Sequence, residues 1–156
     1  MHRRPPLSRP FLAAAGALGL TVSLAACGTG TVHASPADQA ANPLCVKASR
    51  QWPATVADQK SRAVSTKSDT VHAWGNPAII ARCGVTSPGP TTAPCVTVDD
   101  IDWVGTKLSD GTRYITFGRS PALEVLVPTK YNAFPPLGAF TQAARQIPQG
   151  HNRCLG

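Results

Sequence analysis

The alternation of apolar and polar residues predicts a small β-sheet in the second half of the chain. Apolar side chains recur there at every second position, the period expected of strands that bury one face. Four segments follow this pattern: residues 79–85, 101–108, 113–118 and 123–127. An Asp110-Gly111 turn separates the second segment from the third, and this dipeptide between alternating segments favours an antiparallel hairpin.

Two helices are predicted, one on each side of these strands in the sequence. Asn42 is typical of a helix N-cap, Pro43 follows it at the first helical position, and Pro53 would end this helix. A last helix is predicted between Pro136 and Pro148, and its apolar face would consist of Leu137, Phe140, Ala144 and Ile147. Residues 54–71 are polar and weakly periodic, so we expect an exposed loop there. The expected fold class is α+β, with a sheet of about four antiparallel strands and helices packed on one face.

The N-terminus predicts export and a lipid anchor. Basic residues among the first nine positions precede an apolar run over residues 11–24, whereas a membrane-spanning helix needs about 20 such residues. This layout is typical of a signal peptide, here residues 1–26. Leu24-Ala25-Ala26-Cys27 resembles the lipobox of bacterial lipoproteins, whose cysteine is lipidated after cleavage. We therefore expect Cys27 to hold the mature protein on the outer face of the cytoplasmic membrane.

Removal of the signal peptide changes the charge of the chain. The whole sequence has 15 Lys and Arg residues and eight Asp and Glu residues, and three of the basic residues lie within residues 1–26. The mature chain thus has 12 basic and eight acidic residues, a net charge of +4, with no basic run. We expect no nucleic-acid partner, whereas an envelope protein, an anionic cell-wall polymer or a lipid headgroup is a candidate partner. Residues 27–42 would form the lipidated cysteine and a flexible tether, and residues 43–156 a single domain.

The cysteines agree with an extracytoplasmic location. If Cys27 carries lipid, four cysteines remain, and four cysteines allow three pairings. A Gly-, Pro- and Thr-rich stretch separates Cys83 from Cys95, whereas Cys45 and Cys154 lie near the two ends of the folded part. We expect disulfides between Cys83 and Cys95 and between Cys45 and Cys154. Metal-ligand spacings such as CxxC are missing from the sequence, so we predict neither a metal site nor a cofactor.

Several short motifs carry a family resemblance. They are Ala73-Trp74-Gly75-Asn76-Pro77-Ala78, Arg82-Cys83-Gly84-Val85, Asp102-Trp103 and Phe117-Gly118-Arg119-Ser120-Pro121-Ala122. Residues 45–154 resemble the family catalogued as domain of unknown function 3515, which consists of actinobacterial secreted proteins and lipoproteins. The resemblance implies an envelope location and a domain with four cysteines, but no activity. The chain departs from the family pattern at Trp52-Pro53, where Leu-Pro is expected, and this puts the packing of the first helix in doubt.

Candidate functional residues are aromatic and basic. If Arg82 and Arg119 shared an exposed sheet face with Trp74 and Trp103, they would form a site for an anionic or sugar-bearing ligand. In the alternative interpretation the two tryptophans fill the core and Arg119 pairs with Asp102 or Glu124. No catalytic residue is predicted, because a G-x-S-x-G motif is missing from the sequence.

The aspartates at positions 99, 100 and 102 lack the ligand spacing of a calcium loop and are better explained by a turn before a strand.

We therefore expect a non-enzymatic binding or assembly module at the cell surface. The alternative is a small hydrolase or transferase that acts on cell-wall material. A pocket in which titratable groups converge would favour the enzyme, and a groove lined by aromatic and basic side chains would favour binding.

Overall fold

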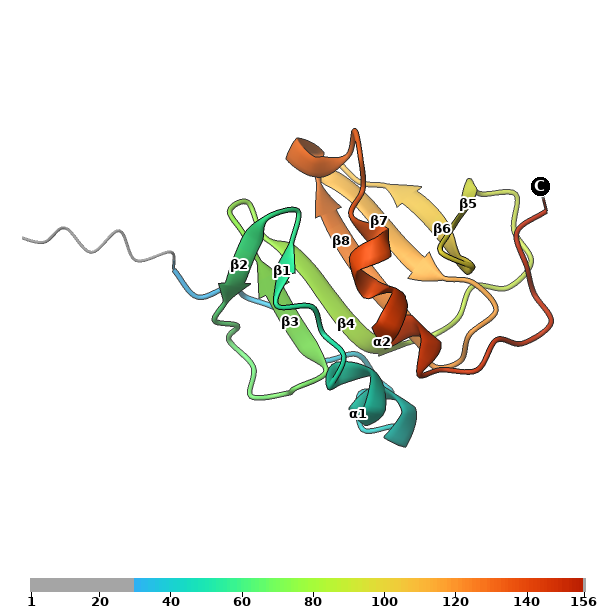
Figure 1. Ribbon diagram of the computed structural model, residues 1–156, viewed down its shortest axis with the longest axis horizontal. Helices are drawn as coiled ribbons and strands as arrows, with labels where there is room; N and C mark the ends of the chain where they lie inside the picture. The colour runs from blue at the N-terminus through green and yellow to red at the C-terminus, as the bar shows by residue number, and fades with distance from the viewer. Residues whose placement is uncertain (1–29, 156) are drawn as a thin grey trace, which may run out of the picture.

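The computed structural model describes residues 30–155, so the predicted signal peptide and Cys27 lie outside the described residues. Eight strands form one antiparallel sheet in the order β1-β2-β3-β4-β8-β7-β6-β5 (Figure 1). They are β1 (Thr55–Val56), β2 (Gln59–Arg62), β3 (Val71–Trp74), β4 (Ile79–Val85), β5 (Cys95–Val98), β6 (Ile101–Lys107), β7 (Gly111–Thr116) and β8 (Ala122–Pro128). The first four strands and the last four each form a meander, and the pairing of β4 with β8 joins the two meanders.

The expected fold class, a sheet of about four strands with helices packed on one face, is therefore wrong. Residues 30–155 are mostly sheet and have twice as many strands, with only two short α-helices. The four predicted segments correspond to the central strands β4, β6, β7 and β8. The other four strands are two to four residues long, and β2 is polar along its whole length. Such strands are too short or too exposed to show the alternation that identifies half-buried strands.

The helices are shorter than the sequence predicts. The first α-helix, α1, spans Pro43–Ser49, and the Oδ1 of its N-cap Asn42 accepts a hydrogen bond from the Leu44 backbone N–H at 2.9 Å. The predicted last helix is a 3₁₀ turn, η2 (Leu137–Phe140), followed by α2 (Thr141–Arg145), and another 3₁₀ turn, η1 (Thr129–Tyr131), follows β8. Among residues 30–155, no helix has the length and apolar character needed to cross a membrane.

Two-residue turns close two of the hairpins. Ala57 and Asp58 join β1 to β2, and Asp99 and Asp100 join β5 to β6. All four residues have positive φ angles between 47° and 64°, as both central positions of a type I′ turn require. The prediction of a turn before a strand is therefore confirmed for Asp99 and Asp100, whereas Asp102 lies within β6.

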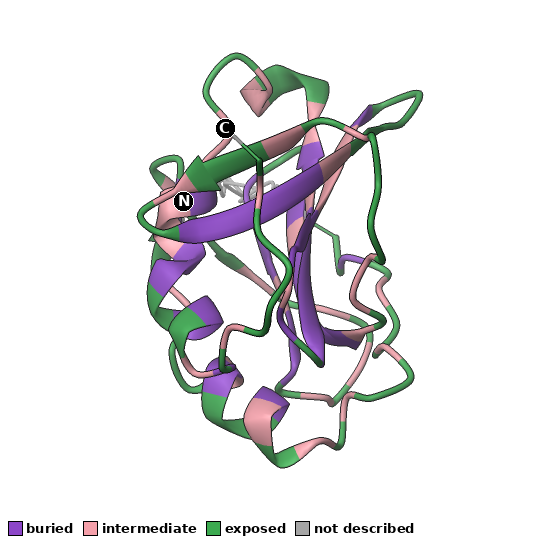
Figure 2. Cartoon of the chain, turned by 90° about the vertical axis from the view of Figure 1, so that its right-hand side faces the viewer, coloured by how far each residue is buried: buried purple, intermediate pink, exposed green. Residues whose placement is uncertain are grey.

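The hydrophobic core contains side chains from both meanders and from both α-helices. Trp74, Trp103 and Phe140 are fully buried and are its largest members. Trp74 and Phe140 meet edge to face, with ring centroids 5.5 Å apart. Figure 2 shows that buried residues follow the strands and the inner sides of the helices, whereas the loops are mostly exposed.

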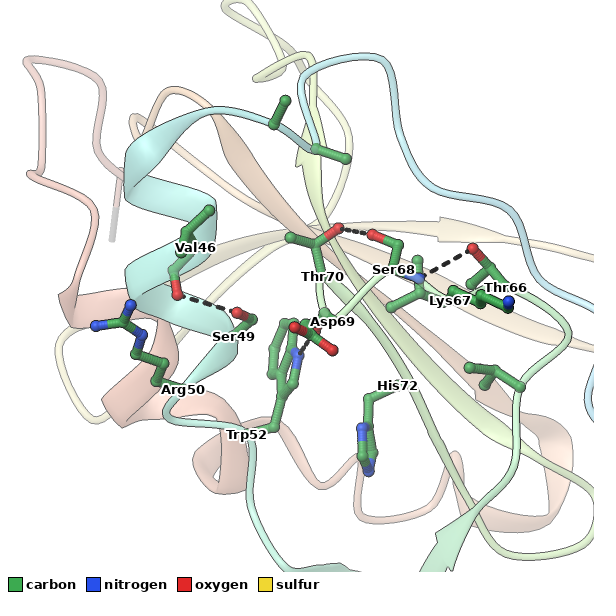
Figure 3. Close-up of a pocket in the computed structure, with 14 residues that line it drawn as sticks. Val46, Ser49, Arg50, Trp52, Thr66, Lys67, Ser68, Asp69, Thr70 and His72 are labelled. Carbon is green, nitrogen blue, oxygen red and sulfur yellow. Dashed lines mark hydrogen bonds between the residues drawn. The ribbon is translucent and has the colours of Figure 1, made fainter.

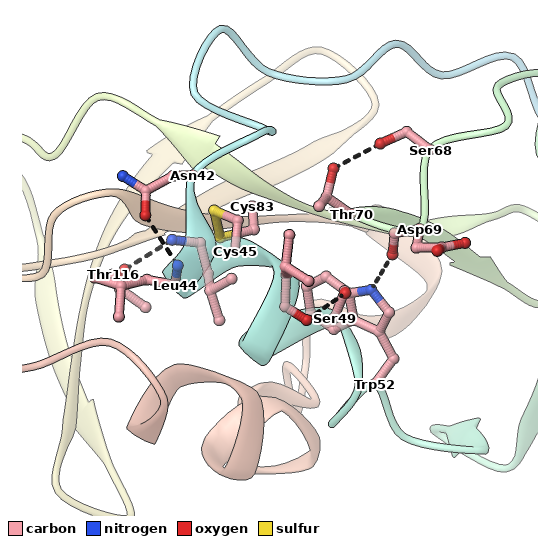
Figure 4. The surroundings of a disulfide bond; sticks show 12 residues. Asn42, Leu44, Cys45, Ser49, Trp52, Ser68, Asp69, Thr70, Cys83 and Thr116 are labelled. Atoms are coloured by element: carbon pink, nitrogen blue, oxygen red, sulfur yellow. Dashed lines mark hydrogen bonds between the residues drawn. A yellow bond between two sulfur atoms is a disulfide. The ribbon is translucent and has the colours of Figure 1, made fainter.

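The described part of the chain has two disulfides, but their pairing differs from the expected one. Cys45 of α1 is joined to Cys83 of β4 (Figure 4), and Cys95 of β5 is joined to Cys154 near the C-terminus. The expected Cys83–Cys95 bond is excluded because β8, β7 and β6 lie between β4 and β5 in the sheet. With neighbouring strands about 4.8 Å apart, these cysteines are separated by roughly 19 Å. The loop between them crosses the sheet and does not form a hairpin.

The segment before α1 is packed on the domain from residue 30 onward. Val32 forms a parallel bridge with Val64, and the Gln39 backbone N–H donates to the Gly84 carbonyl at 3.0 Å. A Cβ atom on Gly84 would lie 2.5 Å from the backbone of this segment, so the approach requires glycine. Residues 30–42, which we expected to belong to a flexible tether, are therefore in contact with the folded domain.

Candidate functional site

A large groove lies between α1 and the loop that leads from β2 to β3. Its volume is about 960 Å³, and it is open to solvent along one side. Arg50 and Trp52 lie on the α1 side, whereas Lys67, Ser68 and Thr70 lie on the loop side (Figure 3). We call it the Trp52 groove.

Trp52 is held in place by the contacts of its indole ring. Its Nε1–H donates to the Asp69 backbone carbonyl at 2.9 Å. The ring also packs edge to face against Trp74 and Phe140, at centroid distances of 6.5 and 6.4 Å. These contacts bury part of the ring, and the remaining part borders the groove. A fixed, half-exposed indole offers a flat apolar surface to a ligand at little entropic cost.

The rest of the groove has a mixed lining, in which alanine and valine side chains contribute apolar surface and four side chains carry hydroxyl groups. Its hydroxyl-bearing side chains are Ser49, Thr66, Ser68 and Thr70. The Ser68 and Thr70 oxygens are 2.8 Å apart, and Thr66 Oγ1 accepts the Ser68 backbone N–H at 3.2 Å. Three charged side chains line the groove, and all three are exposed. Two of them, Arg50 and Lys67, are cations and one, Asp69, is an anion, so the net charge of the groove is positive. The groove therefore combines an aromatic surface, hydrogen-bonding hydroxyls and a net positive charge.

His72 lines one end of the Trp52 groove, and burial lowers the pKa of its imidazole. The charged form is disfavoured because the ring has lost part of its hydration and packs against Trp74, at a centroid distance of 4.6 Å. Neutral imidazole has one nitrogen that donates and one that accepts. Nε2 lies 2.7 Å from Ser61 Oγ, which is exposed on β2.

The Ser61–His72 contact resembles one half of a nucleophilic site. A hydrolytic triad also requires a third group that orients the histidine, as well as donors for an oxyanion. Within residues 30–155, the hydrogen bond to Ser61 is the only one of the His72 side chain, and no cluster of three His, Cys, Asp or Glu side chains could hold a metal ion. The groove therefore lacks the convergence of acid, base and nucleophile that would favour an enzyme.

The candidate binding residues of the sequence are not brought together. Trp74 and Trp103 are fully buried in the core, as the alternative interpretation expected. Arg82 lies opposite Glu124 across β4 and β8, and its Nε is 2.6 Å from the carboxylate. Arg119 is buried, and its guanidinium donates to the Ala144 and Ile147 carbonyls at the end of α2.

The expected pairing of Arg119 with Asp102 or Glu124 is not the contact that forms. Instead the guanidinium donates to two backbone carbonyls at and just after the C-terminal end of α2, and the Ala144 carbonyl also accepts the Ile147 backbone N–H. Burial lowers the pKa of Arg119, and the charge of Arg153 lowers it further, whereas Asp102 opposes the shift. Arginine stays protonated at neutral pH in any case, so the residue acts as a fixed structural cation.

A family model described as Protein of unknown function (DUF3515) matches residues 10–151. The chain belongs to this family. No curated protein and no solved structure gives a match.

The motifs that carry the family resemblance have structural roles in this DUF3515 protein. Trp74 fills the core, and Gly75 has a φ angle of +71° where a Cβ atom would meet the Gln59 side chain at 2.7 Å. The second motif contributes an ion pair through Arg82, a disulfide through Cys83 and a close backbone approach at Gly84. The DUF3515 motifs therefore explain how the domain folds, whereas the Trp52 groove consists of other residues.

Sequence reasoning did not identify the groove residues Arg50, Trp52 and Lys67 as a site. Arg50 and Trp52 follow α1, and Lys67 belongs to a segment that we interpreted only as an exposed loop. One signal was present: Trp52 is the residue at which the sequence departs from the expected Leu-Pro. A large aromatic residue beside a polar loop is consistent with a binding surface. However, Lys67, which lines the same groove as Trp52, lies 15 positions away in the sequence.

Proposed function

We propose that the mature protein is a lipid-anchored binding module on the outer face of the cytoplasmic membrane, and that the Trp52 groove binds a hydroxyl-rich, anionic component of the cell envelope. The composition of the groove carries this proposal. A half-exposed indole can stack on the flat face of a sugar ring, hydroxyls exchange hydrogen bonds with it, and Arg50 and Lys67 attract its negative charge. The ligand class we infer is a sugar that bears carboxylate or phosphate groups.

The anchor rests on the sequence of residues 1–27, in which a short apolar run ends at a lipobox-like cysteine. The two disulfides of the domain fit an oxidising compartment. Cell fractionation tests this part of the proposal. The native chain should appear in the membrane fraction, and a Cys27→Ser variant should be lost from it. A native chain found in the soluble fraction would refute the anchor.

Binding is tested with soluble peptidoglycan fragments, which carry both hydroxyl and carboxylate groups, and with neutral maltohexaose for comparison. Calorimetric titration should give heat with the acidic fragments and little with the neutral sugar. Arg50→Ala and Lys67→Ala should each weaken the interaction by about tenfold, since a hydrogen bond to a charged group contributes about 1.5–3 kcal/mol. Lys107→Ala is the matched control, because Lys107 is equally exposed but ends β6, outside the groove. Equal losses in all three variants would contradict a role for the groove.

The alternative function, a hydrolase or transferase, is favoured by one observation, the 2.7 Å contact between Ser61 and His72. A fluorophosphonate probe distinguishes the two functions because it reacts with activated serines. The binding proposal predicts no labelling of the native protein. Labelling that Ser61→Ala and His72→Gln each abolish would establish a catalytic serine and overturn the non-enzymatic proposal.

A further inference from the structure

Gly30, three residues after Cys27 in the sequence, is held by an arginine at the end of the sheet that contains β1 and β2. Arg62 on β2 donates to the Gly30 carbonyl at 2.5 Å and to the Gly75 carbonyl at 2.8 Å. Gly30 is therefore held against the turn between β3 and β4. This part of the inference rests on the proposed lipid at Cys27, from which Gly30 is three residues away. Three residues span at most about 11 Å, so a lipid on Cys27 keeps this edge close to the bilayer.

The same edge continues from the β3–β4 turn to the 3₁₀ turn η1. Lys130 Nζ donates to the Asn76 carbonyl at 3.2 Å and lies 5.2 Å from the Tyr131 ring centroid. Phe134 follows in the next loop and is 90% exposed. In Figure 1 the described chain starts at the left of the molecule, the β3–β4 turn lies at the upper left and η1 at the top, whereas α1 lies at the bottom. We call the surface formed by Lys60, Arg62, Asn76, Lys130, Tyr131 and Phe134 the anchor edge.

The chemistry of the anchor edge fits the surface of an anionic membrane. Lys60 and Lys130 are exposed cations, and the exposed acids near them are Asp58 and Asp110 in the adjoining turns. Aromatic side chains beside cations are typical of segments that sit at the membrane–water interface. One exposed phenylalanine would bind a bilayer weakly by itself. A covalent lipid raises its effective concentration at the bilayer, so weak contacts are enough to orient the domain.

We propose that the anchor edge rests on the anionic surface of the membrane, with Phe134 inserted among the lipid headgroups. In this orientation α1, which forms one wall of the Trp52 groove, faces away from the bilayer. The groove then opens toward the cell envelope, where a polymer or protein can reach it.

Quenching by brominated lipids tests this orientation. The lipidated full chain is reconstituted in vesicles of phosphatidylglycerol and phosphatidylcholine, with and without bromine on the acyl chains. A Phe134→Trp variant is compared with Leu155→Trp, because Leu155 is 96% exposed and lies near the C-terminus. Bromine should remove most of the fluorescence added by Phe134→Trp and little of that added by Leu155→Trp.

Equal quenching of both variants, or no quenching of either, would overturn the orientation. A second copy of the chain is the competing occupant of the edge, and a blue-shifted emission from Phe134→Trp without vesicles would support that occupant against the membrane. The mass of Cys27 in the purified native protein separates this result from the proposed anchor. If that mass includes lipid and the quenching is still absent, the orientation fails while the anchor stands.

Discussion

The ion pair between Arg82 and Glu124 gives a stability prediction that separates a structural arginine from a ligand-binding one. Glu124 has a side chain that is only 2% exposed, and Arg82 lies directly across from it with the two charged atoms 2.6 Å apart. Removing one partner of a buried pair typically costs about 3–5 kcal/mol, because the other charge stays buried without compensation. Arg113 lies 4.0 Å from the second carboxylate oxygen and supplies part of that compensation. We therefore expect Arg82→Met to lower the free energy of unfolding by about 2–3 kcal/mol.

The two partners should behave differently when each is removed alone. The Arg82 side chain is 32% exposed, so after Glu124→Leu its charge can be hydrated by water, and we expect a loss of only about 1 kcal/mol. In the double variant no buried charge is left without a partner, because the remaining cation, Arg113, is 42% exposed, and the stability of this variant should lie within about 1 kcal/mol of the native protein. Urea unfolding followed by far-UV circular dichroism measures all four proteins. The reasoning is refuted if Arg82→Met lowers the free energy of unfolding by less than Glu124→Leu does. It is also refuted if the loss in the double variant equals the sum of the losses in the two single variants.

Three further predictions follow from the contacts of single side chains. Gly84→Ala should destabilise the protein by more than about 1 kcal/mol in urea unfolding, because its φ is +109° and a Cβ would meet the preceding segment; an unchanged midpoint would contradict this packing. The half-exposed Cys95–Cys154 disulfide should be reduced before the fully buried disulfide between α1 and β4, and mass spectrometry after partial reduction and alkylation would show the opposite order if this is wrong. Because the pKa of His72 is lower in the folded protein, protonation favours unfolding, so its contribution to stability is present above a pH of about 6.5 and lost as the pH falls through its folded-state pKa. His72→Gln should flatten this part of the stability profile in unfolding experiments between pH 7 and 4, and an unchanged slope would refute the assignment.

The central strands could be predicted from the sequence because their side chains alternate between a buried face and a second environment. The turn at Asp110 and Gly111 placed β6 and β7 next to each other, and the structure confirms that pairing. The edge strands could not be found in this way. β2 consists of Gln59, Lys60, Ser61 and Arg62, so its place in the sheet depends on hydrogen bonds to β3 and β1 and not on burial.

The disulfide pairing and the groove depend on the three-dimensional arrangement of distant segments. Cys83 and Cys95 are close in sequence, but the chain between them crosses from one meander of the sheet to the other. The sequence around Arg82 makes it a reasonable candidate for ligand binding. Its ion-pair partner, Glu124, lies 42 positions away, so the pairing cannot be predicted from sequence spacing. Trp52 and Lys67 likewise meet only because β1 and β2 return the chain toward α1. Periodicity and spacing predict local structure. The disulfide pairing, the ion pair of Arg82 and the Trp52 groove can be predicted only when the topology of the sheet is known.

Selective quenching of Trp52 tests the central claim, that the Trp52 groove binds an anionic, hydroxyl-rich ligand. The chain has three tryptophans, and Trp74 and Trp103 are fully buried, so dissolved acrylamide should reach Trp52 alone. Saturating acidic peptidoglycan fragments should protect this quenchable fraction in the native protein. The same protection should require higher fragment concentrations in Arg50→Ala and Lys67→Ala and should be unchanged in Lys107→Ala. Quenching of Trp52 that stays the same with and without bound fragments would show that the ligand lies elsewhere and would contradict the proposed site.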